Sequence, residues 1–311
     1  MRINVIGSGY VGTTLAACLA DLGHDVLAID IDEDVVAALN DGRAPIHEPG
    51  LDDLVADHAG ANLHATTSYD RVPEAAVTFL AIQTPSREDG SIDAAPLAAA
   101  AEMTGEALAD TDEDHLVVVK STITPPALEE VRSALFGACE NAEGRVGLAT
   151  NPEFLREGTA VEDFLAPEKV VLGTEEAWAT ERLEAVYEPL LAAHDAHVVR
   201  TDPATAMLIK YANNAFLATK ISLINDIGNV CKEFGVDAYE VADAIGLDDR
   251  IGEQFLRSGV GWGDHVFQKI LLQLSLQQRT RGTPHPCSTP LSNSTIASPN
   301  ACSTCSTTTS T

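Results

Sequence analysis

Short apolar segments alternate with longer helix-like ones over most of the chain. The β-type runs RINVI and DVLAI flank the segment TTLAACLADLG, which reads as a helix. Further apolar runs of strand length occur in AVTFLAIQTPS, HLVVVKSTITPP, RVGLATNPEF and KVVLG, and Ala/Leu/Glu-rich segments lie between several of them. This alternation is typical of βαβ units and predicts an α/β fold with a doubly wound parallel sheet over residues 1–200.

The first of these units carries a glycine-rich turn. Gly7, Gly9 and Gly12 stand in GSGYVG directly after the first strand, and Asp30 ends the second strand. In a dinucleotide-binding turn the first glycine permits the tight turn, the second lets the backbone approach a pyrophosphate, and the third allows close helix packing. The helix N-terminus offers free N–H groups to the phosphates. A carboxylate at Asp30 would accept hydrogen bonds from a ribose diol and repel a 2′-phosphate, so we expect a Rossmann-like domain that binds NAD rather than NADP.

Polar residues follow the predicted strands at their carboxyl ends. Thr84, Ser121, Thr122, Asn151 and Glu153 occupy such positions. In an open parallel sheet the carboxyl ends of the strands line the ligand crevice, so these residues are candidates for a site. The alternative for Ser121 and Thr122 is the capping of the helix that follows.

Residues 205–234 read as one long helix that is too apolar to be fully exposed. Lys210 and Asn214 are four residues apart and share one face, with Asn225 three turns further on. Charged and amide groups on a buried face need partners or a ligand. A lysine beside an amide can bind an oxyanion, and the structural alternative is a salt bridge with an interhelical amide contact.

The composition is strongly acidic, with 47 Asp and Glu against 19 Lys and Arg and a formal charge of −28. This charge argues against partners such as nucleic acid or an anionic membrane, and it fits a halophilic protein, because concentrated salt screens self-repulsion. No apolar run reaches the roughly 20 residues of a membrane-spanning helix, and the N-terminus differs from a signal peptide. We therefore expect a soluble cytoplasmic protein. Cys18, Cys139 and Cys231 have no metal-ligand spacing, so we expect buried thiols and no metal site.

The composition changes abruptly after Asp264. Residues 1–264 contain all 47 acidic residues and 16 of the Lys and Arg, a formal charge of −31, whereas the last 47 residues contain three basic and no acidic residues. Ser, Thr, Gln and Pro dominate this last part. Because such a composition offers little apolar surface to offset the entropy of ordering, we expect residues 264–311 to be disordered.

Seven motifs together resemble the UDP-glucose/GDP-mannose dehydrogenase family over residues 1–263. In chain order they are GSGYVG, PIHEPGLDDL, IQTPS, KSTITPP, NPEFLREGTAVEDF, KYANNAFLATKISLINDI and GVGWG. Within the family, NPEFLREGTAVEDFLAPEKVVLG looks most like members that act on UDP-glucose. The resemblance implies oxidation of a sugar C6 alcohol to a carboxylate in two NAD-dependent steps, in which a cysteine holds the intermediate as a thioester that water hydrolyses.

The resemblance also implies roles for particular residues. Lys210 and Asn214 match the pair that stabilises oxyanions, and Glu153 matches a carboxylate for general acid/base work on the thioester, with Glu157 one helical turn on as its companion. Thr122 would lie close to the reacting centre. The cofactor side would comprise Gly7, Gly9, Tyr10, Val11, Gly12, Asp30, Thr84 and Thr122.

The sugar nucleotide would also contact this region. Backbone around Phe154 and Leu155 would line the sugar site, next to Lys210 and Asn214, and Arg250 is a further candidate. The resemblance therefore implies a UDP-sugar substrate, NAD as the cofactor, and a homodimer built through the 205–234 helix.

The cysteine nucleophile of the family is missing from the chain as written. After GVGWG the family continues approximately GSCFPKD, whereas this chain has Val266 at the cysteine position and Ile270 at the aspartate position. Valine cannot form the covalent intermediate. Restoring a single G before a coding sequence for DHVFQKILLQ gives GSCFPKDTAA, so we interpret residues 264–311 as an out-of-frame tail.

This interpretation defines three segments. Residues 1–200 form the NAD-binding Rossmann domain, residues 201–263 form a truncated central helical domain for dimerisation and substrate, and residues 264–311 form the tail. On this view the C-terminal UDP-binding domain of the family is absent, and the chain as written does not complete the oxidation.

Two alternatives remain open at the level of sequence. One is a non-enzymatic NAD-binding or hetero-oligomerising module, in which the chain pairs through its long helix with an intact paralogue. The other is a β-hydroxyacid dehydrogenase, which also joins a Rossmann domain to a helix bearing Lys and Asn. The motifs NPEFLREG and KSTITPP argue against the second alternative.

Overall fold

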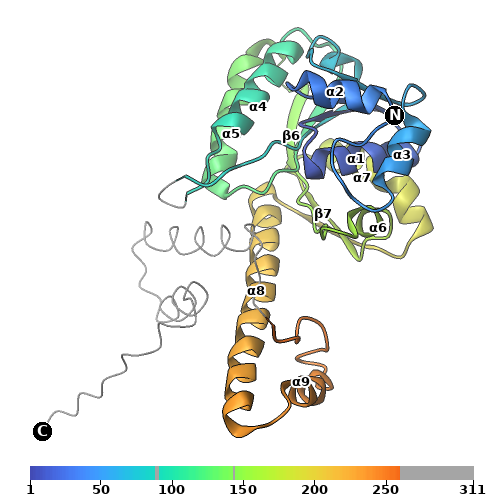
Figure 1. Cartoon of the computed structure of the whole chain (residues 1–311). Helices are drawn as coiled ribbons and strands as arrows, with labels where there is room; N and C mark the ends of the chain where they lie inside the picture. Colours follow the sequence, from blue (N-terminus) through green and yellow to red (C-terminus); the bar gives the residue numbers. More distant parts are fainter. Residues whose placement is uncertain (88–90, 143, 260–311) are drawn as a thin grey trace, which may run out of the picture. The chain divides into compact units, whose positions relative to one another are not determined.

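The computed structural model describes residues 1–87, 91–142 and 144–259. It separates into two compact units. The first unit comprises residues 1–87 and 92–210, and the described part of the second comprises residues 91 and 211–259 (Figure 1). The predictions for residues 264–311, including those for Val266 and Ile270, lie outside the described residues.

An eight-stranded sheet forms the centre of the first unit. Its strands are β1 Arg2–Ile6, β2 Asp25–Ile29, β3 Leu63–Thr66, β4 Val77–Leu80, β5 His115–Val119, β6 Val146–Thr150, β7 Lys169–Gly173 and β8 His197–Thr201. They follow the order β3-β2-β1-β4-β5-β6-β7-β8, and the pairings among β1 to β6 are all parallel. The order 3-2-1-4-5-6 is that of the Rossmann fold, so the predicted fold class is confirmed.

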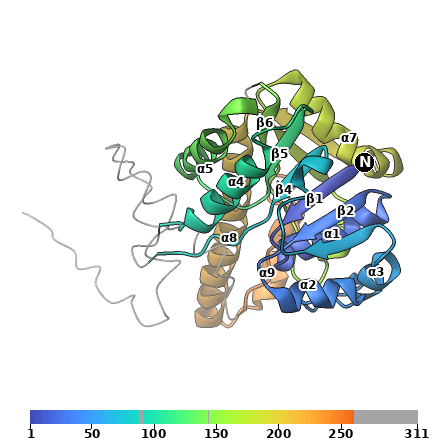
Figure 2. The same ribbon diagram turned by 90° about the horizontal axis from the view of Figure 1, so that it is seen from above.

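Helices cover both faces of this sheet (Figures 1 and 2). A hydrophobic core lies between the sheet and the helices on each of the two faces. The first core contains residues of α1 Tyr10–Asp21, α2 Glu33–Asn40, α3 Leu51–His58, α6 Ala160–Leu165 and α7 Ala177–Ala193. The second contains residues of η1 Val72–Glu74, α4 Ala95–Leu108, α5 Pro125–Ala138 and η2 Glu140–Ala142. Because both faces are buried, a central strand such as β5 is apolar without alternation after His115, and all five of its residues are buried.

The sheet departs from the predicted all-parallel arrangement at β7. β7 pairs with β6 in the antiparallel sense, through Thr150 and Gly173, and β8 runs parallel to β7. Since Thr150 and Gly173 are the last residues of their strands, β7 and β8 extend the sheet beyond the carboxyl end of β6. The segment 151–168 therefore begins at that carboxyl end, where the Rossmann fold places its ligands.

The second unit is helical. The predicted long helix is confirmed as α8 Pro203–Phe234, whose residues up to Lys210 belong to the first unit, and it is followed by α9 Ala238–Gly246. Ile224, Ala242 and Leu256 form a small core within this unit. Asn225 has a structural partner there, because its Oδ1 accepts a hydrogen bond from the backbone N–H of Gly259 at 2.8 Å.

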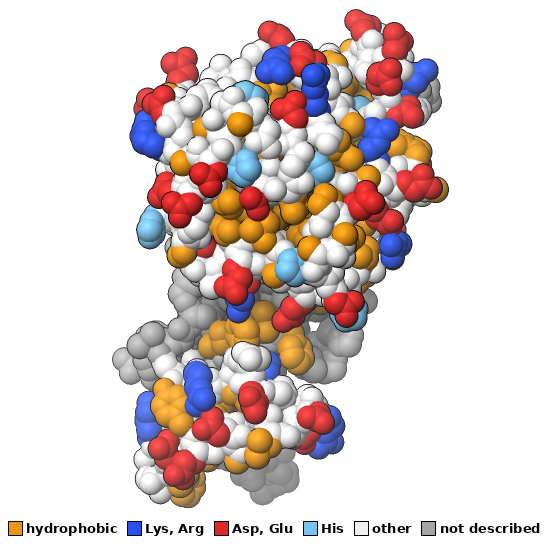
Figure 3. Space-filling model, turned by 90° about the vertical axis from the view of Figure 1, so that its right-hand side faces the viewer, with side chains coloured by type: hydrophobic (Ala, Val, Ile, Leu, Met, Phe, Trp, Pro, Cys, Tyr) orange, Lys and Arg blue, Asp and Glu red, His pale blue; other side chains and the backbone are white. Residues whose placement is uncertain are grey.

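Other expectations from composition can be compared with the structure. Cys18, Cys139 and Cys231 are buried free thiols, as expected, and burial raises the pKa of Cys139. In the described part of the chain, no helix combines the length and the hydropathy needed to cross a membrane. Carboxylate side chains are spread over the face of the first unit seen in Figure 3, in keeping with the acidic composition.

Candidate functional site

The glycine-rich turn between β1 and α1 is closely packed. Gly7 has φ +93°, a conformation that favours glycine, and a Cβ at Gly12 would lie 1.7 Å from the carbonyl oxygen of Gly7. A Cβ at Gly9 would meet only the side-chain amide of Gln83, at 3.3 Å. Gly7 and Gly12 are therefore required by the turn and by helix packing, whereas Gly9 leaves no side chain projecting from the surface of the turn. The packing agrees with the predicted roles of Gly7 and Gly12, and the approach of a pyrophosphate to Gly9 stays a prediction.

Polar groups at this turn are arranged for a dinucleotide. Asp30 Oδ2 accepts a hydrogen bond from Ser8 N at 2.5 Å, and its Oδ1 accepts one from Asp32 N at 3.0 Å. The Ser8 hydroxyl is buried and has no hydrogen-bond partner among the described residues. α1 starts after Gly9, which has no side chain to cap it, so the N–H groups of Tyr10 and Val11 stay available to an anion. A pyrophosphate and a ribose diol fit this set of donors and acceptors.

The strand ends of β4 and β5 bring two predicted threonines together. Thr84 Oγ1 donates a hydrogen bond to the carbonyl oxygen of Thr122 at 3.2 Å. Ser121 Oγ donates to the carbonyl oxygen of Ile82 at 2.6 Å and so joins the same two segments. The capping alternative for Ser121 and Thr122 is wrong, because the residue that caps α5 is Thr124.

A buried ion pair links the segment after β6 to α8. Lys210 Nζ lies 2.8 Å from Glu153 Oε1, and the two side chains are only 4% and 13% exposed. The second carboxylate oxygen of Glu153 accepts a hydrogen bond from Leu155 N at 2.7 Å, and Lys210 Nζ lies 5.3 Å from the centre of the Phe154 ring. The salt bridge considered for Lys210 is therefore present, and it joins two of the predicted catalytic residues.

The segment that carries Glu153 and Glu157 is not helical. Residues 151–158 form an irregular stretch with a turn, and α6 begins only at Ala160. Gly158, with φ +90°, precedes that helix. The expectation that Glu157 lies one helical turn beyond Glu153 is thus wrong, and Glu157 is exposed.

Two further candidates belong to the second unit. Asn214 is buried and its Oδ1 accepts a hydrogen bond from Asn213 Nδ2 at 3.2 Å. Arg250 is 89% exposed at its side chain and pairs with Asp248 at 2.6 Å. Lys210 and Glu153 both belong to the first unit.

A polar cluster around Lys120 was missed by the sequence analysis. Lys120 Nζ donates to Asn151 Oδ1 at 2.7 Å, and the hydroxyl of Tyr187 donates to the same oxygen at 2.5 Å. All three residues are buried. KSTITPP and NPEFLREG include Lys120 and Asn151, but neither motif indicated this pairing, and nothing in the sequence around Tyr187 pointed to it.

A buried carboxylate, Glu48 of PIHEPGLDDL, was also missed. It accepts hydrogen bonds from Tyr10 Oη at 2.6 Å, Gly158 N at 2.9 Å and Ala160 N at 2.7 Å. Burial acts to raise the pKa of Glu48, but these hydrogen bonds outweigh burial and hold the pKa below its usual range. Glu48 thereby connects the start of α1 to the end of NPEFLREG and the start of α6.

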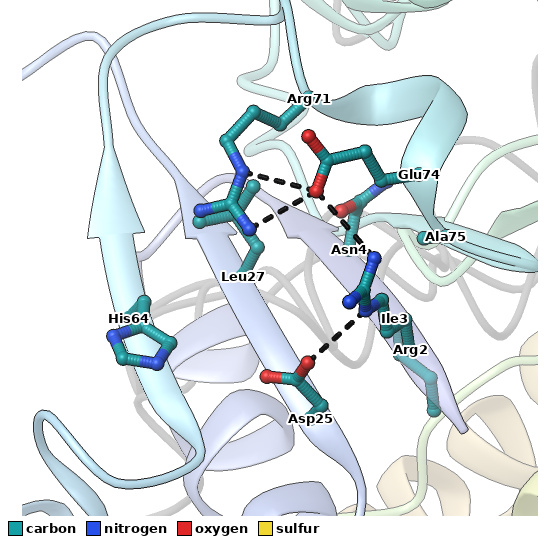
Figure 4. Close-up of a pocket in the computed structure, with 9 residues that line it drawn as sticks. All are labelled: Arg2, Ile3, Asn4, Asp25, Leu27, His64, Arg71, Glu74 and Ala75. Carbon is teal, nitrogen blue, oxygen red and sulfur yellow. Dashed lines mark hydrogen bonds and ion pairs between the residues drawn. The ribbon is translucent and has the colours of Figure 1, made fainter.

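A surface depression lies elsewhere on the sheet (Figure 4). Its charged lining residues pair with one another: Arg2 contacts Asp25 at 3.3 Å and Glu74 at 3.7 Å, and Arg71 contacts Glu74 at 3.1 Å. None of its lining residues belongs to the candidate site. Among residues 1–87, 91–142 and 144–259, no group of three His, Cys, Asp or Glu side chains is arranged to hold a metal ion.

Comparison with known proteins adds to this geometry. The model for the NAD binding domain of the UDP-glucose/GDP-mannose dehydrogenase family matches residues 1–191, and the model for its central domain matches residues 204–295. The chain belongs to this dehydrogenase family. The central-domain match continues beyond Gly263, near which the sequence analysis places the change of frame. Membership leaves the β-hydroxyacid dehydrogenase alternative without support.

Relatives within the dehydrogenase family are similar over most of this chain. A UDP-glucose 6-dehydrogenase of Haloferax volcanii, AglM, is 54% identical over 91% of the chain and 66% of its own length. A UDP-glucose dehydrogenase structure from Pyrobaculum islandicum matches with a TM-score of 0.85 and 38% identity, over 90% of this chain and 64% of that one. A GDP-mannose dehydrogenase structure from Pseudomonas aeruginosa matches with a TM-score of 0.75 and 32% identity, over 92% and 66%. The chain thus spans about two thirds of the length of these relatives.

Proposed function

We propose that this chain represents an NAD-dependent nucleotide-sugar 6-dehydrogenase whose substrate is UDP-glucose. The observation that carries the proposal is the buried Lys210–Glu153 pair, found in the same unit as the glycine-rich turn. A charged pair that is taken out of water costs free energy, and a catalytic centre is one place where proteins retain it. The 54% identity to the Haloferax volcanii enzyme supports UDP-glucose as the sugar nucleotide.

The cofactor side of the proposal rests on the turn after β1. Gly9 leaves room for a pyrophosphate, and the N–H groups of Tyr10 and Val11 point out of the start of α1. The Asp30 carboxylate would accept a hydrogen bond from a ribose hydroxyl, either in place of its hydrogen bond from Ser8 N or in addition to it. NAD bound there would supply the hydride acceptor of an alcohol oxidation.

Lys210 and Glu153 would act on the sugar. The ammonium group of Lys210 can donate hydrogen bonds to an oxygen that becomes negative, and burial strengthens that interaction. Glu153 can accept or return a proton once its bond to Lys210 is shared with a substrate oxygen. On family resemblance we assign Thr122 and Glu157 to the same site, and Phe154 and Leu155 to the substrate. Asn214, as a catalytic candidate, and Arg250, as a substrate candidate, are proposed on the same resemblance and belong to the second unit.

The second unit supports the proposed homodimer through α8. Phe216, Leu223 and Val230 are exposed apolar residues seven positions apart, and Phe234 is exposed near the helix end. Residues seven apart fall on nearly one line of a helix, so they form an apolar stripe. Exposed apolar stripes of this kind mark interaction surfaces.

The chain as written carries Val266 where the family has its cysteine, and we infer that it binds NAD without forming the acid. The experiment compares the purified chain with a matched control in which one G is inserted before codon 264. Calorimetry measures NAD and NADP binding, and mass spectrometry measures UDP-glucuronate formed from UDP-glucose, with GDP-mannose as the alternative substrate.

Each result has a defined meaning. We expect both chains to prefer NAD to NADP, and only the control chain to form UDP-glucuronate. UDP-glucuronate formed by the chain as written would refute its inactivity, and a control chain that oxidises GDP-mannose alone would refute the sugar. Absence of NAD binding by both chains would refute the dehydrogenase proposal itself.

A further inference from the structure

A third buried ionisable group, Lys120, belongs to the same unit as Lys210 and Glu153. Lys120 is the first residue after β5, and it is 4% exposed. Lys120 Nζ donates to Asn151 Oδ1 at 2.7 Å and lies 3.5 Å from the hydroxyl of Tyr187. Both partners are neutral, so the amino group is hydrogen-bonded without a carboxylate in direct contact.

Asn151 connects this amino group to the chain segment of Glu153. The Asn151 Nδ2 donates to the carbonyl oxygen of Val171 at 2.8 Å, and the Asn151 backbone N–H donates to the carbonyl oxygen of Val119 at 2.9 Å. The amide is thus fixed at both ends, and Glu153 follows it by two residues. Lys120 and the backbone from which Glu153 extends are therefore joined through a single residue, Asn151.

Lys120 is also coupled to the pair through charge. The pKa of Lys120 is lowered to about 7, chiefly by burial; the negative charge of Glu153 opposes this lowering, and the positive charge of Lys210 adds a smaller contribution to it. The ionisable groups that face Lys120 are Glu153 after β6, Tyr187 on α7 and Lys210 on α8. Burial raises the pKa of Tyr187, so this phenol stays neutral.

We propose that Lys120 is a positioning residue for the Lys210–Glu153 pair, because it fixes the segment of Glu153 and its protonation sets the net charge of the buried centre. With Lys120 protonated the three groups carry one net positive charge, and with Lys120 neutral they carry none. The positive centre is the better environment for an oxygen that becomes negative beside Lys210. Its relevance to catalysis rests on the proposed function, whereas the coupling itself does not.

The test is an NMR titration of the chain as written, labelled with ¹³C at lysine Cε. The sequence contains six lysines, Lys120, Lys169, Lys210, Lys220, Lys232 and Lys269, so the spectrum is simple enough to assign from the variants K120M, K210M and K232M. We expect the Lys120 signal to titrate well below the ordinary range of a lysine side chain. We also expect the Lys210 signal to shift at the midpoint of Lys120, because coupled groups respond to each other's protonation.

The substitution K120M removes that response, and the matched surface substitution K232M keeps it. A residue that only filled space would leave the Lys210 titration unchanged in K120M. A Lys120 signal that titrates in the ordinary range of a lysine side chain, or a shift of Lys210 that persists in K120M, would overturn the inference. Should K120M fail to fold, the shared midpoint in the unsubstituted chain decides, since its absence also overturns the inference.

Failure of the proposed function is measured separately. NAD is titrated into the same labelled sample and binding is followed by calorimetry. Absence of binding would contradict the dehydrogenase proposal while the two lysine titrations still decide whether Lys120 is coupled to Lys210. Binding with uncoupled titrations would contradict only the role of Lys120.

Discussion

Replacement of Gly12 by alanine tests the packing of the glycine-rich turn. The new Cβ would lie 1.7 Å from the Gly7 carbonyl oxygen and 2.8 Å from its carbon, whereas ordinary contacts begin at 3.4 Å. The neighbour is backbone, so α1 must move away from β1 by roughly 1.5 Å, and overpacking of this kind costs about 1–3 kcal/mol. We expect G12A to lose unfolding free energy near the upper end of that range, and to lose NAD binding with it.

Gly9 provides the matched control. Its added Cβ would meet only the end of the Gln83 side chain, at 3.3 Å, so the fold should lose less than about 1 kcal/mol. The same methyl group projects from the surface on which a pyrophosphate would lie, and we expect G9A to weaken NAD binding by at least about tenfold, or about 1.4 kcal/mol.

The assay combines guanidinium unfolding followed by circular dichroism with calorimetric NAD titration, for the unsubstituted chain, G9A and G12A. We expect the two variants to differ in stability, with G12A unstable and G9A stable, while both bind NAD weakly. A G12A chain with unchanged stability would refute the packing argument, and a G9A chain with unchanged NAD affinity would refute the assignment of the turn to the pyrophosphate.

Three further predictions concern charged side chains. K210M should lower the unfolding free energy by about 3–5 kcal/mol, because it leaves the Glu153 carboxylate buried and unpaired, and the double variant K210M/E153Q should recover part of this loss in the same guanidinium assay. Between about pH 7 and 10.5 the unfolded chain binds a proton at Lys120 that the folded chain does not. The unfolding free energy of the unsubstituted chain should therefore rise with pH relative to that of K120M, by about 5 kcal/mol over this window. A difference in unfolding free energy between the two chains that does not change with pH would contradict burial of the charge. D30A should weaken NAD binding by about tenfold and NADP binding less, as measured by calorimetry, because the carboxylate is the group that distinguishes the two riboses; an equal loss for both contradicts that role.

Local chemistry explains why much of the fold could be predicted. The turn from β1 to α1 is specified within one short segment, since Gly7 and Gly12 each meet backbone that a side chain would strike. The direction of β7 could not be predicted in the same way. Its sequence KVVLG is apolar and β-branched, and such a pattern is identical for a parallel and an antiparallel neighbour.

The candidate site was predictable as a set of residues and not as a geometry. Lys210 and Glu153 were both singled out, but their ion pair depends on the packing of α8 near the end of β6, which is a tertiary contact. The predicted position of Glu157 was wrong because the Glu153 side chain accepts a hydrogen bond from Leu155 N, and the chain there forms a turn instead of a helix. Lys120 was overlooked because a lysine after an apolar strand is usually exposed.

The acidity of the chain bears on the buried lysines. Lys120 and Lys210 are two of only six lysines, and both lie inside a protein of formal charge −28. At low ionic strength this surrounding negative charge favours the protonated amine and so raises the pKa of Lys120, against the effect of burial. At about 1 M salt the screening length falls to about 3 Å, and among the charged groups only the neighbours Glu153 and Lys210 still act on Lys120. The lysine titration should therefore give a midpoint for Lys120 that falls as KCl rises from about 0.1 M to about 1 M and then stays constant. A midpoint that rises with salt would contradict this account. It would mean that the charges around Lys120 disfavour its protonated form on balance, so that the attraction of Glu153 does not govern the charge of this centre.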